Sequence, residues 1–489
     1  MSAKEASTVQ GPVRWLTVPA SLGALLFAGL HVAFRDEHYS VLAGILSGLN
    51  GALALLAFLR YRAVRPDHFP AIEVMLGLHY FQYGLPITVP PHELGVWRVV
   101  PSSASTDVAA LLALGCALTL VGGFAFVLRL VRPIAALPVV PNLRREDLAR
   151  AAPLYIPLAG AWLLSYNLAR SDLHAGAGTA FAIFSTVLSA VPMAVIATAV
   201  LVFSPTFGAR VRFLLMCLVC LVSMAVSGML THAATPLAAA ALVWVRLRGR
   251  IPLVLVAVVA AVLLVLQPVK SHYRGIRWGN ESRVGVVQAW GEAFADAASL
   301  GRLTRGGEEA RSRFSELDVL AYTIELVPGA VPHSHGRAYE ITLFSAIPRV
   351  LWPDKPNMSM AGTDAFTIPL GLQTRELAEL SATGLSIPPH GYLEHGVVGS
   401  LGWMGLVGLA FGLIVRVFGR GIAAELAVPT VGVSMAFATG GGFVSFFGSI
   451  WQSLFGTLML LWLLHGVGRA LTLFRPTARA DAIPLSKRA

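Results

Sequence analysis

Long apolar runs recur along most of this 489-residue chain, and they limit what it can fold into. A helix needs about 20 residues to cross the roughly 30 Å hydrocarbon core of a membrane. Apolar residues make up 56% of the sequence and charged residues only 13%, too few charges for the surface of a soluble protein of this length. We predict about twelve transmembrane helices, at residues 15–34, 40–59, 69–89, 107–128, 153–169, 179–203, 211–230, 232–245, 251–268, 398–418, 425–443 and 446–467.

The formal net charge of +11 is distributed according to the predicted topology. Twenty-two Lys and Arg residues fall in the loops and tails on one side of the predicted spans, whereas the short loops of the other side hold only Arg35, Arg98 and Arg170. Because basic residues concentrate on the cytoplasmic side, we predict a multi-pass protein of the bacterial inner (cytoplasmic) membrane with both termini cytoplasmic. The basic loops are expected to contact anionic membrane lipids, and nucleic acid is not an expected partner.

The predicted spans divide the chain into four parts. Residues 1–267 form an N-terminal bundle of about nine helices, 268–397 a large periplasmic loop, 398–468 the C-terminal transmembrane helices, and 469–489 a cytoplasmic tail. The fold class is therefore an all-α polytopic membrane protein. Residues 142–150 are short and charged, and we predict a separate cytoplasmic helix at the membrane surface there.

The periplasmic loop differs in composition from the rest of the chain, with twelve basic and fourteen acidic residues. Apolar residues recur at helical spacing at Val287, Trp290 and Phe294, and again between residues 314 and 327. This pattern predicts two amphipathic helices that lie on the membrane or cap the bundle. Loops of this length usually carry function, so the chemistry is expected here.

The three cysteines, Cys116, Cys217 and Cys220, all fall inside predicted spans. No disulfide is therefore expected in the periplasmic loop. The C-x-x-C of Cys217 and Cys220 lacks the partner ligands of a zinc or redox site, so we interpret both as small residues in helix packing.

Two clusters in the loop could bind phosphate. The run KSHYRGIRW places Arg274 and Arg277 just outside the ninth span, where guanidinium groups could grip a phosphate at headgroup level. The run FSAIPRVLWPDKPN has three prolines, which predict a rigid non-helical turn that presents Arg349 and Lys355. The alternatives are snorkelling to lipid headgroups for the first cluster and a solvated structural turn for the second.

Two further clusters contain histidines. In VPHSHGRAY, at 331–339, His333 and His335 have the spacing of metal ligands on a strand, but no carboxylate pair or cysteine accompanies them, and we predict no metal. In IPPHGYLEHGVVG, at 387–399, His390 and Glu394 are four residues apart and share a face if a helix begins by residue 389. A histidine oriented by a carboxylate can act as a general base; the alternative is that both residues merely cap a helix start.

The chain resembles the O-antigen polymerase (Wzy) family, the oligosaccharide repeat-unit polymerases, and more distantly the O-antigen ligases. The resemblance is carried by the layout of many spans with one large outer loop, by GRAYEITLFSAIPRVLWPDKP at 336–356, and by PPHGYLEHGVVG at 388–399. The sequence departs at Gly391, where ligases usually have Asn. The resemblance implies a glycosyltransferase fold of the GT-C-like class.

It also implies the activity: polymerisation of undecaprenyl-pyrophosphate-linked repeat units into O-antigen or exopolysaccharide by en bloc glycosyl transfer at the periplasmic face. Without a metal or other cofactor, the leaving pyrophosphate would be stabilised by cations. The expected roles are catalysis by His390 and Glu394, pyrophosphate binding by Arg274, Arg277, Arg349 and Lys355, and substrate binding by Arg337, Tyr339, Trp352 and Tyr392.

The expected partners are the lipid-linked donor and acceptor oligosaccharides, with a chain-length regulator as a further candidate. Two other functions stay open. An O-antigen ligase would move the glycan to the lipid A core, and a flippase would only move the lipid-linked sugar across the membrane. A flippase would be expected to show inverted repeats and charges inside its spans, and the sequence shows neither.

Overall fold

The protein is described by a computed structural model over residues 17–64, 70–131, 140–168, 187–228, 231–248, 285–297, 315–347, 358–380, 384–418, 421–438 and 442–473, with 269–270, 272–273, 276, 352, 354 and 356. Within this part the chain is all-helical. The first half forms α2 (Thr17–Phe34), α3 (Val41–Val64), α4 (Ala71–Tyr83), the short 3-10 helix η1 (Leu85–Thr88), α5 (Ser103–Leu130), α6 (Arg145–Leu168), α8 (Ala190–Phe203), α9 (Phe207–Ser227) and α10 (Thr231–Arg248).

The second half begins with short helices of the predicted periplasmic loop and ends with three long ones. The short ones are α12 (Val286–Ala297), α14 (Glu316–Leu326), α15 (Arg337–Ala346), α16 (Met358–Gly362), the π turn η3 (Thr363–Thr367) and α17 (Arg375–Leu380). The long ones are α18 (Ile387–Val417), α19 (Ile422–Ala438) and α20 (Gly442–Leu473).

Several helices are long and apolar enough to cross a membrane, which indicates a membrane protein. In the described part there are five such stretches: Val41–Tyr61, Ser103–Leu130, Phe207–Ser227, Ile387–Val417 and Ser453–Thr472. Three shorter apolar helices occupy Ser21–Phe34, Ala190–Phe203 and Ile422–Ala436. Large apolar side chains such as Leu111, Phe126 and Leu214 point outward from these helices, as expected of surfaces that face lipid.

Most described helices overlap the predicted spans, but some ends differ: α4 ends at Tyr83, before the predicted end at 89, and α18 begins at Ile387, before the predicted start at 398. The predicted span 251–268 lies outside the described residues, so the number of twelve crossings stays a prediction. Residues 145–150 do not form a separate surface helix: α6 runs without interruption from Arg145 to Leu168. Its first turn carries Glu146 and Asp147, which favour a helix N-terminus, so the charged run begins the span and does not precede it.

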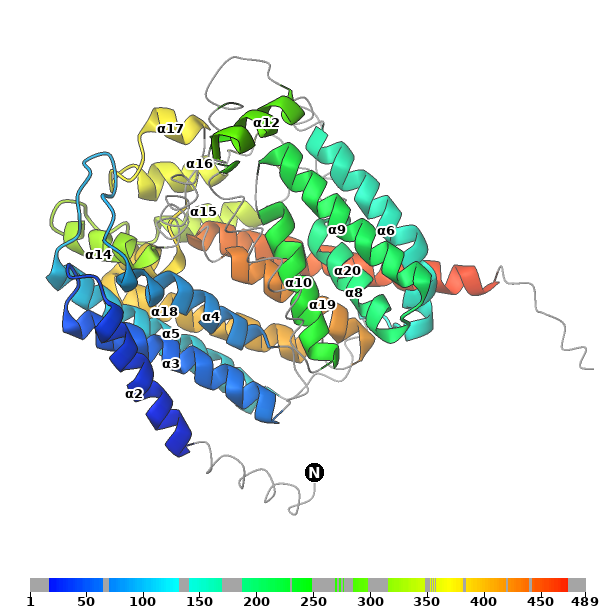
Figure 1. Cartoon of the computed structure of the whole chain (residues 1–489), viewed down its shortest axis with the longest axis horizontal. Coiled ribbons are helices and arrows are strands. Elements are labelled where there is room, and N and C mark those ends of the chain that lie inside the picture. The colour runs from blue at the N-terminus through cyan, green and yellow to red at the C-terminus, as the bar shows by residue number, and fades with distance from the viewer. Residues whose placement is uncertain are drawn as a thin grey trace, which may run out of the picture.

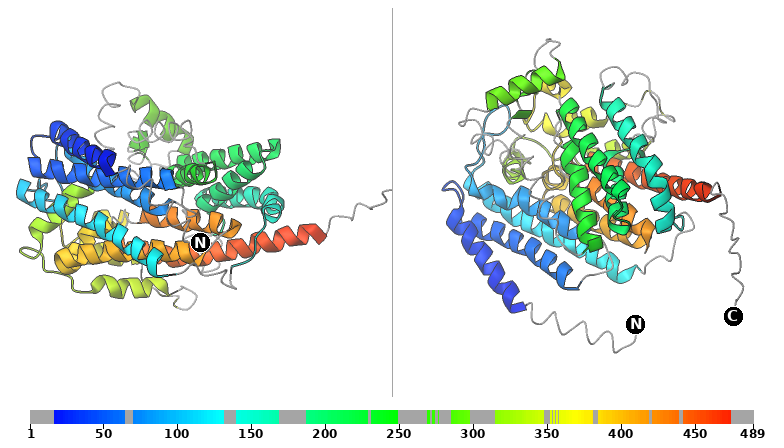
Figure 2. Two further views of the ribbon diagram at one scale, coloured as in Figure 1. Left: turned by 90° about the horizontal axis from the view of Figure 1, so that it is seen from below. Right: turned by 45° about the vertical axis from the view of Figure 1, so that its right-hand side comes forward.

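The long helices form two groups that meet along α18, α19 and α20. On one side α2, α3, α4, α5 and α18 pack in succession, and on the other α6, α8, α9 and α10 pack with α19 and α20 (Figure 1). Figure 2 shows the same division from two further sides, with α20 extending beyond the bundle at its C-terminal end. Contacts of α19 with α4 and of α18 with α19 and α20 join the two groups.

The pair α5 and α18 makes the most extensive helix contact, and glycines allow it. A Cβ atom on Gly408 would collide with the backbone carbonyl of Leu120, and one on Gly123 with that of Gly405. Small residues let two membrane helices approach to backbone contact, where dispersion forces replace the hydrophobic effect that lipid does not supply. The close contact fixes α18, which carries part of the candidate site.

The short helices of residues 268–397 pack onto helix ends of the bundle. The predicted topology places all of these ends on the periplasmic side. α14 lies against α5, α18 and α4, and α15 lies against α20 and α16. Tyr39, just before α3, donates a hydrogen bond to Asp318 of α14 at 2.9 Å, and Ser102, just before α5, donates its backbone N–H to Glu325 of α14 at 3.0 Å. In Figure 1, α14, α16 and α17 lie at the left and upper left of the bundle, α15 lies nearer its centre, and α12 lies at the top, where it contacts α9.

Both predicted amphipathic helices are present. In α14, Leu317, Leu320 and Ala321 are fully buried, as the helical spacing predicts. In α12, Trp290 is buried and donates its indole N–H to the carbonyl of Ala225 in α9 at 2.5 Å, whereas Val287 and Phe294, the other two residues of the predicted apolar face, are exposed. α14 therefore caps the bundle, and α12 contacts α9 through Trp290 with part of its apolar face left exposed.

Candidate functional site

The structure brings together two of the clusters that the sequence singled out, at 331–339 and 387–399. The backbone N–H of Ser334 donates to the carbonyl of Leu393 at 3.0 Å, and Nδ1 of His333 lies 3.2 Å from the same oxygen. These two segments are about sixty residues apart in the sequence, so only the fold places them side by side.

Glu394 fixes the junction between them. Its Oε2 accepts the backbone N–H of Gly336 at 2.5 Å and its Oε1 accepts that of Ala338 at 2.9 Å. These groups form the N-terminus of α15, where backbone N–H groups lack helical partners and the helix dipole favours a negative charge. The side chain is 0% exposed, so the carboxylate is an internal cap that attaches α15 to α18.

The helix α18 is broken just after Glu394. His395 (φ −146°, ψ 28°) and Gly396 (φ 61°, ψ −145°) leave the helical conformation, and Gly396 takes a positive φ that glycine adopts without strain. The first segment folds back on the second: Ser400 donates its hydroxyl to the carbonyl of Pro388 at 2.8 Å. A Cβ on Gly391 would lie 2.7 Å from the Cα of Ser400, so Asn, the residue usual in ligases, does not fit here.

Among the side chains that are exposed or half-buried around this break, we define four as the kink surface: Arg337, Tyr339, Tyr392 and His395. Nε2 of His395 lies 3.1 Å from the hydroxyl of Tyr339, and the two rings stack with centroids 5.9 Å apart. Tyr339 also packs against Trp403, with centroids 5.0 Å apart. Burial and the nearby carboxylate of Glu394 raise the pKa of Tyr339, so its hydroxyl keeps its proton at neutral pH.

His390 lies behind the kink surface and not on it. Only 2% of it is exposed, and its ring centroid is 4.1 Å from that of Phe366 in η3. Its backbone N–H donates to the carbonyl of Ser386 at 3.1 Å, within the first turn of α18. The predicted base is thus part of the packing that holds the first segment of α18.

The other predicted residues are placed as follows. Arg337 is exposed at the first position of α15, and Tyr392 is half-buried with its ring centroid 6.3 Å from that of His333. Trp352 is half-buried and meets Phe344 edge to face at 5.5 Å. All four predicted pyrophosphate-binding residues lie outside the described residues: Arg274, Arg277, Arg349 and Lys355.

Sequence reasoning missed two features of this region. One is His395, which lies inside the quoted motif but was not assigned a role; the adjacent Gly396 is the local signal for a break that would expose it. The other is a hydrogen-bonded chain in which Ser386 Oγ donates to Glu316 Oε2 at 2.6 Å and lies 2.7 Å from the hydroxyl of Tyr83. No sequence pattern links these three residues.

Burial raises the pKa of two carboxyl groups at the start of α14, Glu316 and Asp318. Burial raises the pKa of Glu316 to about 7, and the hydrogen bond from Ser386 only partly opposes that effect. Burial likewise raises the pKa of Asp318, against hydrogen bonds from Ser315 and Tyr39 and the nearby His92. Of the two, Glu316 is the carboxyl group whose raised pKa lies near neutral pH.

No metal centre is formed by the described residues: they contain no group of three or more His, Cys, Asp or Glu arranged to hold a metal ion. The rings of His333 and His335 are 5.7 Å apart, and those of His335 and His395 are 6.1 Å apart. His333 and His335 thus extend a cluster of rings from His395 of the kink surface.

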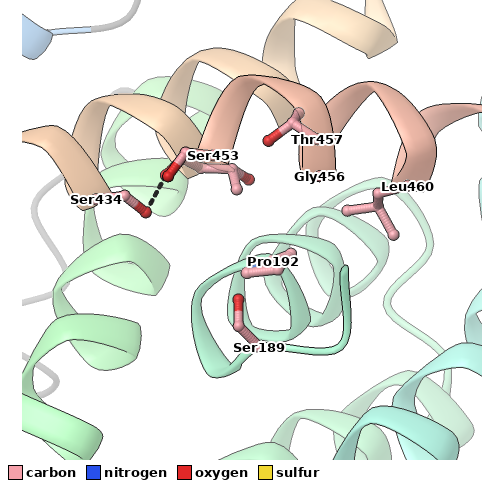
Figure 3. Close-up of a pocket in the computed structure, with 8 residues that line it drawn as sticks. Ser189, Pro192, Ser434, Ser453, Gly456, Thr457 and Leu460 are labelled. Atoms are coloured by element: carbon pink, nitrogen blue, oxygen red, sulfur yellow. Dashed lines mark hydrogen bonds between the residues drawn. The ribbon is translucent and has the colours of Figure 1, made fainter. Parts of the chain in front are cut away.

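A separate polar feature is a small cavity of about 30 Å³ between α8, α19 and α20 (Figure 3). Its lining carries five hydroxyl groups, with Pro192, Gly456 and Leu460 completing it: Ser189, Thr430, Ser434, Ser453 and Thr457. Thr430 donates its hydroxyl to the carbonyl of Leu426 at 2.6 Å, and Ser434 to that of Thr430 at 2.8 Å. Such bonds satisfy hydroxyls inside apolar bundles, and the cavity is distinct from the kink surface.

The model of a family described as "Domain of unknown function (DUF8712)" matches residues 156–438, more than half of the chain. The match starts within α6, contains every predicted site residue, and ends at the last residue of α19. No curated protein and no solved structure matches the chain.

Proposed function

The chain belongs to the family of the domain of unknown function DUF8712, and we propose that it is a membrane-embedded glycosyltransferase that polymerises lipid-linked oligosaccharides. In this proposal the protein lies in the bacterial inner membrane with about twelve crossings and a GT-C-like arrangement. The segment 268–397 faces the periplasm and both termini face the cytoplasm. The substrates are undecaprenyl-pyrophosphate-linked repeat units, and the product is O-antigen or exopolysaccharide.

The observation that carries the proposal is the mixed character of the kink surface. Polar and aromatic side chains are exposed there beside apolar ones: Leu343 lies one turn after Tyr339 on α15, and Val398 follows the break in α18. Leu343 is 71% exposed and Val398 78% exposed. A sugar attached to a polyprenyl chain needs polar and apolar side chains side by side, because its sugar head binds polar groups and its lipid tail binds apolar ones.

The chemistry needs three elements, and the chain offers a candidate for each. Aromatic rings can stack on sugar faces, and Tyr339 and Tyr392 lie at the kink surface, with Trp352 a further candidate. Cations must stabilise the departing pyrophosphate, which is the role proposed for Arg274, Arg277, Arg349 and Lys355, with Arg337 on the substrate side. A base must take the proton of the acceptor hydroxyl; His390 is the residue predicted from the sequence.

Glu394 has a supporting part in this scheme. Because both of its oxygens accept backbone N–H groups of α15, it holds the kink surface together. Glu394 thus has two candidate roles, pairing with His390 and capping α15. Substitution of Glu394 distinguishes them, because loss of the cap lowers protein stability as well as reaction rate.

The test is an in vitro assay on the full-length protein in lipid nanodiscs, supplied with an undecaprenyl-pyrophosphate-linked repeat unit. Gel separation of the products is expected to show a ladder of several repeats on one lipid carrier. Glycan found only on added lipid A core would indicate a ligase. Movement of the substrate across the bilayer without any new glycosidic bond would indicate transport; either result would contradict the proposal.

A further inference from the structure

The break in α18 gives one histidine a setting that the others lack. His395 is exposed, and its Nε2 is held 3.1 Å from the hydroxyl of Tyr339, which is itself packed against Trp403. When Nε2–H donates to the phenol oxygen, the lone pair of the imidazole is on Nδ1. The ring is thereby held in place with one nitrogen left for a substrate.

The neighbouring histidines are less suited to take a proton from a bound sugar. His390 is 2% exposed and packed on Phe366, so an acceptor hydroxyl does not reach its ring without a rearrangement of η3. Nδ1 of His333 lies 3.2 Å from the carbonyl of Leu393, and the residue is half-buried. Nothing comparable to the Tyr339 contact fixes the ring of His335 in the described part of the chain.

We propose that His395 is the catalytic base of the transfer reaction, with Tyr339 as its positioning residue; this inference rests on the proposed function. The substrate that it would contact is the acceptor sugar of a lipid-linked oligosaccharide. Val397 and Val398, directly after the break, are exposed apolar residues that fit the polyprenyl end of such a substrate. The acceptor therefore lies with its sugar at His395 and its lipid along α18.

The step balances without any further reagent. The acceptor hydroxyl oxygen forms a bond to the anomeric carbon of the donor, and its proton passes to Nδ1 of His395. The bond between that carbon and the pyrophosphate oxygen breaks, and its electron pair leaves with undecaprenyl pyrophosphate. The imidazolium then returns its proton to solvent, to which His395 is exposed.

The experiment compares single variants in the nanodisc polymerisation assay. A positioned general base contributes about 10²- to 10⁴-fold to rate, so His395→Ala is expected to lower kcat by that factor with a small change in KM. Added imidazole is expected to restore part of the activity, because the deleted ring is at the surface. Tyr339→Phe keeps the ring stack but removes the hydroxyl, and a loss of about tenfold in kcat is expected.

His38→Gln is the matched control, since this exposed histidine pairs with Asp36 before α3. It is expected to polymerise like the wild type. Full activity of folded His395→Ala would overturn the inference. It would also be overturned if added imidazole restored activity to His390→Gln but not to His395→Ala, and the base would then be His390. A wild-type protein that makes no polymer would instead defeat the proposed function.

Discussion

The carboxylate of Glu394 accepts the backbone N–H of Gly336 at 2.5 Å, across 58 positions of sequence. Together with its second bond to Ala338, this contact attaches α15 of the loop to the first segment of α18. A glutamate that a motif marks as catalytic is thus also a helix cap. The distinction matters for how its variants are interpreted.

Glu394→Gln should therefore lower the stability of the protein as well as the rate of the transfer reaction. The amide keeps one oxygen but turns an NH₂ group toward a backbone N–H, and a buried donor left without an acceptor costs about 1–3 kcal/mol. We expect a lower Tm in detergent. Glu340→Gln, which alters an exposed carboxylate on α15, is the control; equal stability of the two variants would argue against the cap.

Gly391→Ala tests the fold-back of α18. A Cβ at this position would lie 2.7 Å from the Cα of Ser400 and 2.8 Å from the carbonyl oxygen of Gly399, so the two segments must separate. We expect a marked drop in Tm and poor recovery after extraction. Gly402→Ala on the same helix meets nothing within 4 Å and should be neutral, or stabilising by roughly 0.5–1 kcal/mol. Similar behaviour of the two would contradict the break as described.

The pH dependence of stability should carry the signature of Glu316. Its pKa is about 7 in the folded protein and near its ordinary value of 4.5 when unfolded, so the folded state binds the extra proton between these values. Stability should therefore fall as pH rises from 4.5 to 7, and then level off. Burial of Asp318 acts in the same direction.

Glu316→Gln removes the ionisable group and should flatten this decline, with its largest gain over the wild type above pH 7. Thermal unfolding between pH 5 and pH 8 measures it. If the Tm of the wild type instead rises with pH through this range, and the Tm of the variant rises in the same way, Glu316 does not control the pH dependence of stability.

Arg349→Ala should abolish polymer formation while expression stays normal, because the departing pyrophosphate loses a cation. The catalytic role that the sequence analysis assigns to His390 predicts the same loss for His390→Ala. If His395 is instead the base, any activity that His390→Ala loses should be accompanied by a lower Tm, because His390 packs against Phe366. Arg375→Ala, at an arginine that pairs with Asp364 at 3.6 Å, is the control for charge removal. Wild-type polymer levels in Arg349→Ala would remove it from the pyrophosphate site.

The apolar runs predicted where most of the described helices lie, because a bilayer selects long apolar segments. They did not predict the helix ends, since α4 has 13 residues and α18 has 31. Their period also predicted α12 and α14. Local sequence could not show that Arg145 opens α6, because a charged first turn and a separate surface helix have the same composition. Nor could it show the ladder from Tyr83 through Ser386 to Glu316, which joins three distant segments.

The site was predicted in part. The motifs at 331–339 and 387–399 were recognised, and the fold places them together. Which histidine faces solvent depended on the break at Gly396 and on the burial of His390 against Phe366, both of which are set by tertiary packing. The helical spacing of His390 and Glu394 predicted a shared face but not what that face contacts.

The most direct measurement of the central claim is the stoichiometry of lipid release. Full-length protein in nanodiscs is supplied with a single undecaprenyl-pyrophosphate-linked repeat unit, and free undecaprenyl pyrophosphate and glycan length are followed by mass spectrometry. En bloc polymerisation predicts one undecaprenyl pyrophosphate released for each new glycosidic bond, with the growing glycan passing to the carrier of the newly added repeat unit at each transfer. Substrate that is bound or moved with no undecaprenyl pyrophosphate released would contradict the account.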